Sequence, residues 1–285
     1  MKAIAHFKCL PIEHPDALVE IDIPEPVPGP RDLLVEVKAV SVNPVDTKVR
    51  QGYVPHEDES QPRILGWDAA GVVKSVGSDV TLFKPGDRVW YAGSLIRPGS
   101  NSELQLVDER IVGSMPQSLD FSKAAALPLT SLTAWELLFN RLGVARDTTD
   151  RGETLLIIGA AGGVGSILTQ LARQLTGLTI IGTASRPETQ TWVTELGAHH
   201  VIDHTKPLSE ELKRIGIAQV SHVASLTQTD RHYEQIIESL KPQGKLGLID
   251  DPATLDAVPL KRKSLSLHWE LMYTRSLYET EDMQE

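Results

Sequence analysis

A glycine-rich turn in the middle of the chain has the spacing of a dinucleotide-binding loop. It follows a short apolar run, Thr154–Ile158, and precedes apolar residues that recur at helical spacing. Counted from Ala160, the turn is a small-x-Gly-x-x-Gly variant, although glycines also end strands for purely structural reasons. Gly162 would let the backbone approach a pyrophosphate, and Gly165 would let the helix pack closely on the strand, while free N–H groups at the helix start would face the phosphates. The residues predicted to bind the cofactor here are Ala160, Gly162, Gly163, Val164 and Gly165.

A serine and an arginine stand where such a loop places its ribose-reading residue. A second strand-like run, 178–183, follows the helix and ends about twenty residues past Gly165. The residues there are Ser185 and Arg186 rather than an acid. An acid would bind the 2′-hydroxyl of NAD, whereas a hydroxyl and a guanidinium suit the 2′-phosphate of NADP. We therefore expect NADP(H) as cofactor; the alternative is that Arg186 is a solvated surface charge.

Composition limits the class of protein and its partners. With 285 residues, two domains are expected. The 28 basic and 38 acidic residues give a net charge of −10, which argues against nucleic-acid and membrane partners. The single cysteine, Cys9, excludes an internal disulfide and any multi-cysteine metal site. Together with the lack of a signal-peptide pattern, this favours a cytoplasmic protein.

The first 121 residues have the pattern of short strands separated by turn residues. A proline-rich run, 24–30, can neither enter a sheet interior nor form a helix. We expect a compact all-β or barrel-like domain over residues 1–121. Its predicted strands are 18–23, 33–42, 69–76 and 88–91.

From Ser122 the periodicity changes to alternating helices and strands. A helix capped by Ser122 is expected over 122–126, and another over 131–142 before Gly143. The alternation that follows predicts parallel βαβ units over residues 122–274, with ligand at the carboxyl ends of the strands. The predicted strands are 154–158, 178–183, 199–202, 219–224, 244–250 and 264–273, and the helices are 163–175, 187–196, 208–215 and 229–240.

Five motifs in order resemble the medium-chain dehydrogenase/reductases. They are most similar to the zinc-independent quinone oxidoreductases and the related zinc-type alcohol dehydrogenase-like proteins. The resemblance implies an α/β protein with a GroES-like catalytic domain, a doubly wound parallel-sheet Rossmann domain, and NADPH bound in the cleft between them. The motifs are the glycine turn, Val42-Asn-Pro-Val-Asp46, Ile64-Leu-Gly-Trp-Asp-Ala-Ala-Gly-Val-Val73, Phe83-Lys-Pro-Gly-Asp-Arg-Val89 and Leu127-Pro-Leu-Thr-Ser-Leu-Thr-Ala-Trp135.

Zinc ligands are missing from the positions where zinc-dependent relatives carry them. By the resemblance, Asn43 and Trp67 stand in place of cysteine and histidine. Tryptophan cannot ligate zinc, and asparagine is a poor ligand. The adjacent His199 and His200 lie on a strand-like segment, so that their side chains point to opposite faces. We expect no metal site.

Without a metal, hydrogen-bond donors must stabilise the negative charge that hydride transfer places on the acceptor oxygen. The resemblance implies that Asn43 and Tyr53 lie at the cleft and that Thr130 and Thr133 begin the helix facing the nicotinamide. Tyr53 is the best side-chain donor; its alternative is an exposed loop tyrosine beside the acidic run 56–59. Asn43 and Tyr53 are the predicted catalytic residues.

Three further positions complete the predictions for the site. His204 follows a strand end where relatives place an aromatic residue near the adenosine phosphate, although a simple exposed histidine is the alternative. Ser225 to Thr227 follow another strand end, so their backbone is predicted to border the nicotinamide. Asp46 is predicted to be a cap or surface residue rather than a proton donor.

The leading hypothesis is an NADPH-dependent reductase of quinones or α,β-unsaturated carbonyls. The alternatives are a non-catalytic NADPH-binding or interaction protein and an alcohol dehydrogenase, which would lack the zinc that acidifies the hydroxyl. A homodimer is one expected assembly.

The end of the chain differs from the relatives. In them, the strand corresponding to 264–273 is followed by a helix, and the chain then returns to complete the catalytic domain. Here an acidic end, 275–285, follows. We expect a truncated or variant form with an incomplete catalytic domain, less stable and less active than an extended one.

Overall fold

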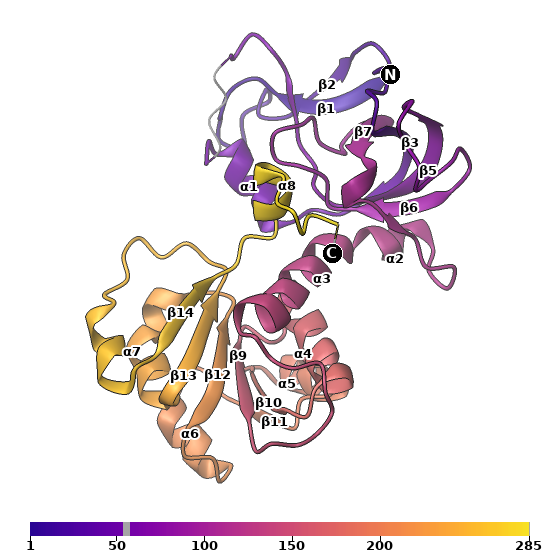
Figure 1. Cartoon of the computed structure of the whole chain (residues 1–285). Coiled ribbons are helices and arrows are strands. Elements are labelled where there is room, and N and C mark those ends of the chain that lie inside the picture. The colour runs from indigo at the N-terminus through magenta and orange to yellow at the C-terminus, as the bar shows by residue number, and fades with distance from the viewer. Residues whose placement is uncertain (54–57, 285) are drawn as a thin grey trace. The chain divides into compact units, whose positions relative to one another are not determined.

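The computed structural model describes residues 1–53 and 58–284 and divides the chain into two compact units (Figure 1). The first unit comprises Met1–Leu129 together with the C-terminal residues from Tyr273 onward, and the second is Thr130–Met272. The division therefore falls at Leu129, not at the predicted residue 121, and the end of the chain is part of the first unit.

The first unit consists of two antiparallel sheets. Strands 18–23, 33–42, 69–76 and 88–91 were predicted and are present with bounds within two residues, whereas the other four strands of this unit were not predicted. Leu33, Val73 and Val89 form part of one buried core between the strands. The smaller sheet has the order β2 (Val19–Asp22), β1 (Lys2–His6), β4 (Arg63–Ile64). The larger has the order β7 (Leu104–Asp108), β3 (Asp32–Val40), β5 (Ala69–Val76), β6 (Arg88–Tyr91), β8 (Gly113–Ser114).

Short helices complete the first unit. Helix α2 (Phe121–Ala125) begins one residue before its predicted start. Its cap is Asp120 rather than Ser122, because the Asp120 carboxylate accepts from the Lys123 N–H at 2.8 Å. Ala124 and Ala125 of this helix pack against Ala70 of β5, which is why the first unit continues past residue 121. The helices are α1 (Pro44–Arg50), η1 (Glu109–Ile111), α2 (Phe121–Ala125) and α8 (Thr274–Tyr278).

The second unit is built on one parallel sheet. Its order is β11, β10, β9, β12, β13, β14, so the strand order reverses between β9 and β12. This is the order of a Rossmann sheet, in which ligands bind outside the carboxyl ends of the strands at the point of reversal. The strands are β9 (Thr154–Ile158), β10 (Thr179–Thr183), β11 (His200–Ile202), β12 (Val220–Ser225), β13 (Leu240–Leu248) and β14 (Ser266–Trp269).

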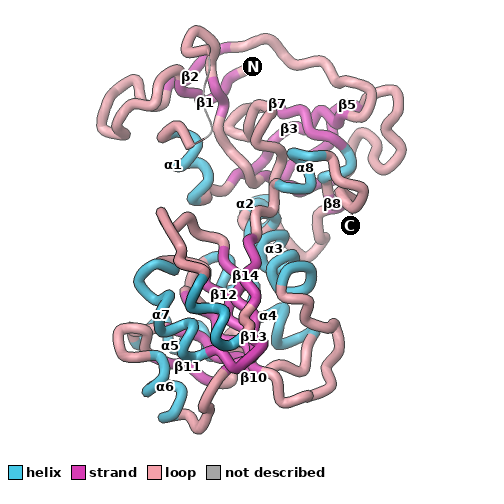
Figure 2. Tube along the Cα trace, turned by 60° about the vertical axis from the view of Figure 1, so that its left-hand side comes forward, coloured by secondary structure: helices cyan, strands magenta, loops and turns pink. Residues whose placement is uncertain are grey.

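Helices cover both faces of this sheet (Figure 2). On one face lie α3 (Pro128–Trp135), the π-helix η2 (Glu136–Arg141), α4 (Gly163–Leu175) and α5 (Pro187–Glu195). On the other lie α6 (Leu208–Arg214), α7 (Thr229–Ser239) and the 3₁₀ helix η3 (Val258–Lys263). In the described parts of the chain, no helix has the length and apolar character needed to cross a membrane.

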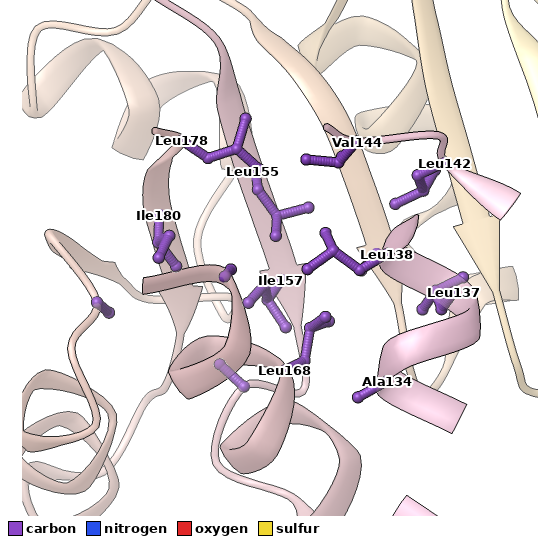
Figure 3. Close-up of a cluster of buried hydrophobic side chains, with 14 of the residues drawn as sticks. Ala134, Leu137, Leu138, Leu142, Val144, Leu155, Ile157, Leu168, Leu178 and Ile180 are labelled. Atoms are coloured by element: carbon purple, nitrogen blue, oxygen red, sulfur yellow. The ribbon is translucent and has the colours of Figure 1, made fainter. Parts of the chain in front are cut away.

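Alternate residues of β9 enter two separate cores. Figure 3 shows Leu155 and Ile157 beside Leu138 of the π-helix. Leu156 faces the opposite way and packs with Leu212 of α6. Each such side chain contributes about 1.5–3 kcal/mol when it is fully buried. The strand is therefore fixed from both faces, and so is the turn that follows it.

Candidate active site

The glycine turn follows β9 and starts α4 in the second unit. Gly159 has a φ of +81°, and the Gly162 N–H donates to the Gly159 carbonyl oxygen at 3.0 Å. A Cβ on Gly165 would lie 2.3 Å from that same oxygen and 2.6 Å from Cα of Ala160. Only glycine fits there, and the close packing of helix on strand that the spacing predicts is present.

The five predicted residues of the turn differ in burial, and Val164 is half-buried. Ala160 and Gly165 are buried beneath the turn, whereas Gly162 and Gly163 are exposed at the start of α4. Gly162 is the N-cap and has no side chain to satisfy the first N–H groups of the helix. Uncapped N–H groups and the helix dipole together attract an anion. The exposed glycines could thus hold a phosphate, while Ala160 and Gly165 support them from below.

Three threonines from different elements surround this turn. The Thr183 hydroxyl, at the end of β10, accepts from the Gly159 N–H at 3.1 Å. The Thr130 methyl of α3 lies 3.2 Å from the place of a Cβ on Gly163, and the Thr227 methyl lies 3.0 Å from that of a Cβ on Gly159. The structure therefore brings Thr130 to the glycine turn, and its position facing the nicotinamide stays a prediction. Thr183 was not predicted, because its role depends on the pairing of β10 with β9.

Thr133 lies one turn further along α3 and is buried. The structure thus places one of the two predicted threonines at the glycine turn and the other inside the helix packing.

Ser185 and Arg186 follow β10, the strand next to β9. Arg186 is the N-cap residue of α5 and is exposed, while Ser185 is half-buried. Among residues 1–53 and 58–284, the Arg186 guanidinium forms no ion pair. Because parallel strands end at the same edge of the sheet, this cation and the glycine turn share that edge.

His204 is not a simple exposed histidine. Its ring packs edge-on against the ring of His232 in α7, with the ring centroids 6.1 Å apart and the planes at 89°. The Nδ1 atoms of both rings are buried and have no hydrogen-bond partner within the described chain. Burial, together with the charge of His204, lowers the pKa of His232.

Ser225 is fully buried as the last residue of β12. Its carbonyl oxygen accepts from the Ile249 N–H at 3.4 Å, and its hydroxyl is hydrogen-bonded to the Thr229 hydroxyl at 2.7 Å. The residues that follow it, 226–228, form the loop that lies against Gly159. Of the predicted residues 225–227, Ser225 is therefore buried in the sheet, whereas Leu226 and Thr227 belong to this loop.

In the first unit, Asn43 and Tyr53 lie at opposite ends of α1. Asn43 is the buried N-cap, and its backbone N–H donates to the Asp46 carboxylate at 2.8 Å, so Asp46 is a cap as predicted. Tyr53 follows the helix and is 64 % exposed. The Lys48 ammonium lies 6.0 Å from its ring centroid. Within the acidic run 56–59, His56 and Glu57 lie outside the described residues.

Asp68, a residue that was not predicted, holds the Asn43 side chain. The Asn43 amide donates to the Asp68 Oδ2 at 3.0 Å and to the Ser41 hydroxyl at 3.3 Å. The Ser41 hydroxyl and the Leu129 N–H also donate to Asp68, at 2.8 and 3.2 Å. Burial raises the pKa of Asp68 to about 6 against these hydrogen bonds. Its position as the only charged residue in the apolar stretch 64–73 was the available signal.

The residues at the expected zinc position do not suit zinc. Trp67 is 1 % exposed and its indole N–H donates to the Ser94 carbonyl at 3.0 Å, so it fills this place as a packed side chain. In the residues that the structure describes, no three His, Cys, Asp or Glu side chains gather into a possible metal site. Zinc would need three such ligands and an open position.

Two family models match this chain. The alcohol dehydrogenase GroES-like domain matches residues 29–117, and the zinc-binding dehydrogenase family matches residues 163–285. A zinc-type alcohol dehydrogenase-like protein of Staphylococcus epidermidis is 40% identical over 285 residues, which cover 99% of this chain and 83% of that protein. The chain belongs to the medium-chain dehydrogenase/reductase superfamily.

Solved structures of this superfamily agree with the assignment. A Rhizobium etli protein assigned as a zinc-dependent alcohol dehydrogenase is 53% identical with a TM-score of 0.94, over 100% of this chain and 82% of its own. The Escherichia coli quinone oxidoreductase, solved in complex with NADPH, is 29% identical with a TM-score of 0.83. The match covers 100% of this chain and 84% of that chain. The predicted combination of a GroES-like and a Rossmann domain is confirmed, and the superfamily membership makes this chain an oxidoreductase.

Proposed function

We propose that this oxidoreductase uses NADPH to reduce a quinone or an α,β-unsaturated carbonyl compound without a metal. The proposal rests on the edge of the parallel sheet in the second unit at which the strands end. There the exposed N-terminus of α4 and the exposed Arg186 follow neighbouring strands. The similarity to a quinone oxidoreductase solved with NADPH supports both the cofactor and the acceptor.

Each part of this edge suits one part of the cofactor. The N–H groups at Gly162 and Gly163 would hold the pyrophosphate, because the helix start is uncapped. The Ser185 hydroxyl and the Arg186 guanidinium would hold the 2′-phosphate. Thr130 and the loop 226–228 flank the glycine turn from its other sides and would border the nicotinamide. The bound cofactor supplies a hydride.

Residues of the first unit are assigned to the acceptor. The Tyr53 phenol would donate a hydrogen bond to the acceptor oxygen, where negative charge develops, because this side chain is exposed. The Asn43 amide already donates to Asp68 and Ser41, so we assign Asn43 to holding the start of α1 rather than to the oxygen.

A screen of quinones and enones tests the proposal through the loss of NADPH absorbance. We expect acceptor-dependent oxidation of NADPH that a chelator does not slow. Binding of NADPH without turnover for any acceptor would favour the alternative of a non-catalytic NADPH-binding protein. Turnover that requires added zinc would refute the metal-free mechanism.

A further inference from the structure

A chain of buried hydrogen bonds ties together the carboxyl ends of two neighbouring strands. Thr229, the first residue of α7, is fully buried, as is Ser225 at the end of β12. Their hydroxyls are 2.7 Å apart. Asp250 follows the end of β13 and accepts twice from Thr229: from its N–H at 2.8 Å and from its hydroxyl. The three side chains thus connect β12, α7 and the end of β13.

The loop between the two tied residues lies on the glycine turn. The Leu226 N–H donates to the Ile158 carbonyl oxygen at 3.1 Å, and the Thr227 methyl packs toward Gly159. Gln228 has a φ of +51°, which side-chain-bearing residues adopt only where the surroundings hold them. The bonds at Ser225 and Thr229 therefore fix a strained loop at the point where the strand order reverses.

Capping of α7 alone does not require this arrangement. The N-cap residue, Gln228, makes no side-chain cap, although a serine or aspartate at that position would satisfy the helix start locally. Asp250 supplies the cap from 21 residues away. A distant cap adds what a local cap cannot, because it fixes the loop relative to the next strand of the sheet.

We propose that Thr229 and Asp250 are positioning residues for the nicotinamide half of the cofactor, acting through the loop 226–228. This inference rests on the proposed binding of NADPH by the second unit. Strand β9 lies between β10, whose end carries Arg186, and β12, whose end carries the loop. The two strand ends therefore serve different halves of one ligand, and a change at Thr229 affects only the half that the loop borders.

The test compares two ligands that share the phosphate-bearing adenosine. Dissociation constants of NADPH and of 2′,5′-ADP, which lacks the nicotinamide, are measured by calorimetry for the wild-type protein, Thr229→Val, Asp250→Asn and Thr229→Ser. We expect Thr229→Val and Asp250→Asn to raise the dissociation constant of NADPH about tenfold, which corresponds to the loss of one hydrogen bond to a charged group. The dissociation constant of 2′,5′-ADP should change less than twofold. Thr229→Ser keeps the hydroxyl and should restore wild-type binding of both ligands.

The ratio of the two constants separates positioning from general damage. An equal rise in both dissociation constants, or no change in either, would overturn the inference. If Thr229→Val does not fold, as judged by its melting temperature, Asp250→Asn and Thr229→Ser decide it by the same ratio. A wild-type protein that binds 2′,5′-ADP but no NADPH would also overturn it, and binding of neither ligand would refute the proposed function itself.

Discussion

A buried pair of glutamates leads us to expect that the stability of the second unit depends on pH. Glu270 follows β14 and is 4 % exposed. The Arg141 Nε lies 2.7 Å from its Oε2, and the Arg141 Nη2 lies 3.6 Å from the Glu136 Oε2. Burial and the negative charge of Glu136 raise the pKa of Glu270 to about 8, although Arg141 lowers it. One arginine thus serves two buried carboxyl groups, so the fold favours a proton on Glu270.

The direction and the size of the effect follow from this pKa. The pKa of an unperturbed glutamate is 4.5, so between pH 4.5 and about 8 the folded chain binds a proton that the unfolded chain has lost. The stabilisation that this proton gives the folded state is complete below pH 4.5 and is lost as pH rises through 8. One pKa unit corresponds to about 1.4 kcal/mol, so the full loss is at most about 5 kcal/mol. The side chain of the variant Glu270→Gln cannot ionise, so the variant should not show this loss of stability.

The assay is denaturant unfolding of the wild-type protein and Glu270→Gln between pH 5 and 8.5. We expect similar free energies of unfolding at pH 5 and an advantage of about 2–5 kcal/mol for the variant at pH 8.5. The pKa of the nearby His268 is lowered by burial, Lys245 and Arg141, and its titration occurs in both proteins. Glu195→Gln on the exposed side of α5 is the control and should follow the wild-type curve. Parallel curves for wild type and Glu270→Gln would refute the reasoning.

Three further predictions concern the cofactor, the metal and the glycine turn. Arg186→Ala should weaken the binding of NADPH about ten- to a hundredfold and leave the binding of NADH unchanged, because only the 2′-phosphate loses a charge-assisted hydrogen bond. Equal weakening of the binding of both cofactors in fluorescence titrations would contradict the assignment. Purified protein should contain no stoichiometric zinc by elemental analysis, because Asn43 and Trp67 are unsuited to it; one zinc per chain would overturn the hydrogen-bond mechanism. Gly165→Ala should lower the melting temperature by several degrees, since its Cβ would lie 2.3 Å from the Gly159 carbonyl oxygen. Gly162→Ala, with its nearest contact at 3.3 Å, should lower it less, and an equal loss in both variants would contradict the packing argument.

Local patterns were sufficient for the centre of the second unit but not for strand β13. The bounds of β9 and α4 were predicted without error because an apolar run and a helical repeat are both continuous there. The predicted strand 244–250 begins four residues earlier, at Leu240. The pairing is irregular in this part of the strand: Gln243 has a φ of +64°, and the register with β12 shifts.

The hydrogen-bonded partners in the candidate site could not be predicted because they are distant in sequence. Asp68 is 25 residues from the Asn43 that it holds, and Asp250 is 21 residues from Thr229. No periodicity relates such pairs, since strand pairing alone brings them together. Helix α1 was missed although its signal is local: Asn43 and Asp46 form a capping box around a proline at the helix start.

The strand order of the second unit also has a consequence for the time course of folding. Pairing of β9 with β12 brings together residues 67 apart, as in the contact of Thr154 with Ser221, whereas β9, α4 and β10 form one local unit. Contacts between distant residues form slowly, because the intervening chain must lose its freedom first. We therefore expect the glycine turn to exist in an early intermediate, while the loop over Gly159 joins it only after the two halves of the sheet have met. A newly made chain would then pass through a state in which its phosphate-binding turn is present but its ligand site is still open on one side.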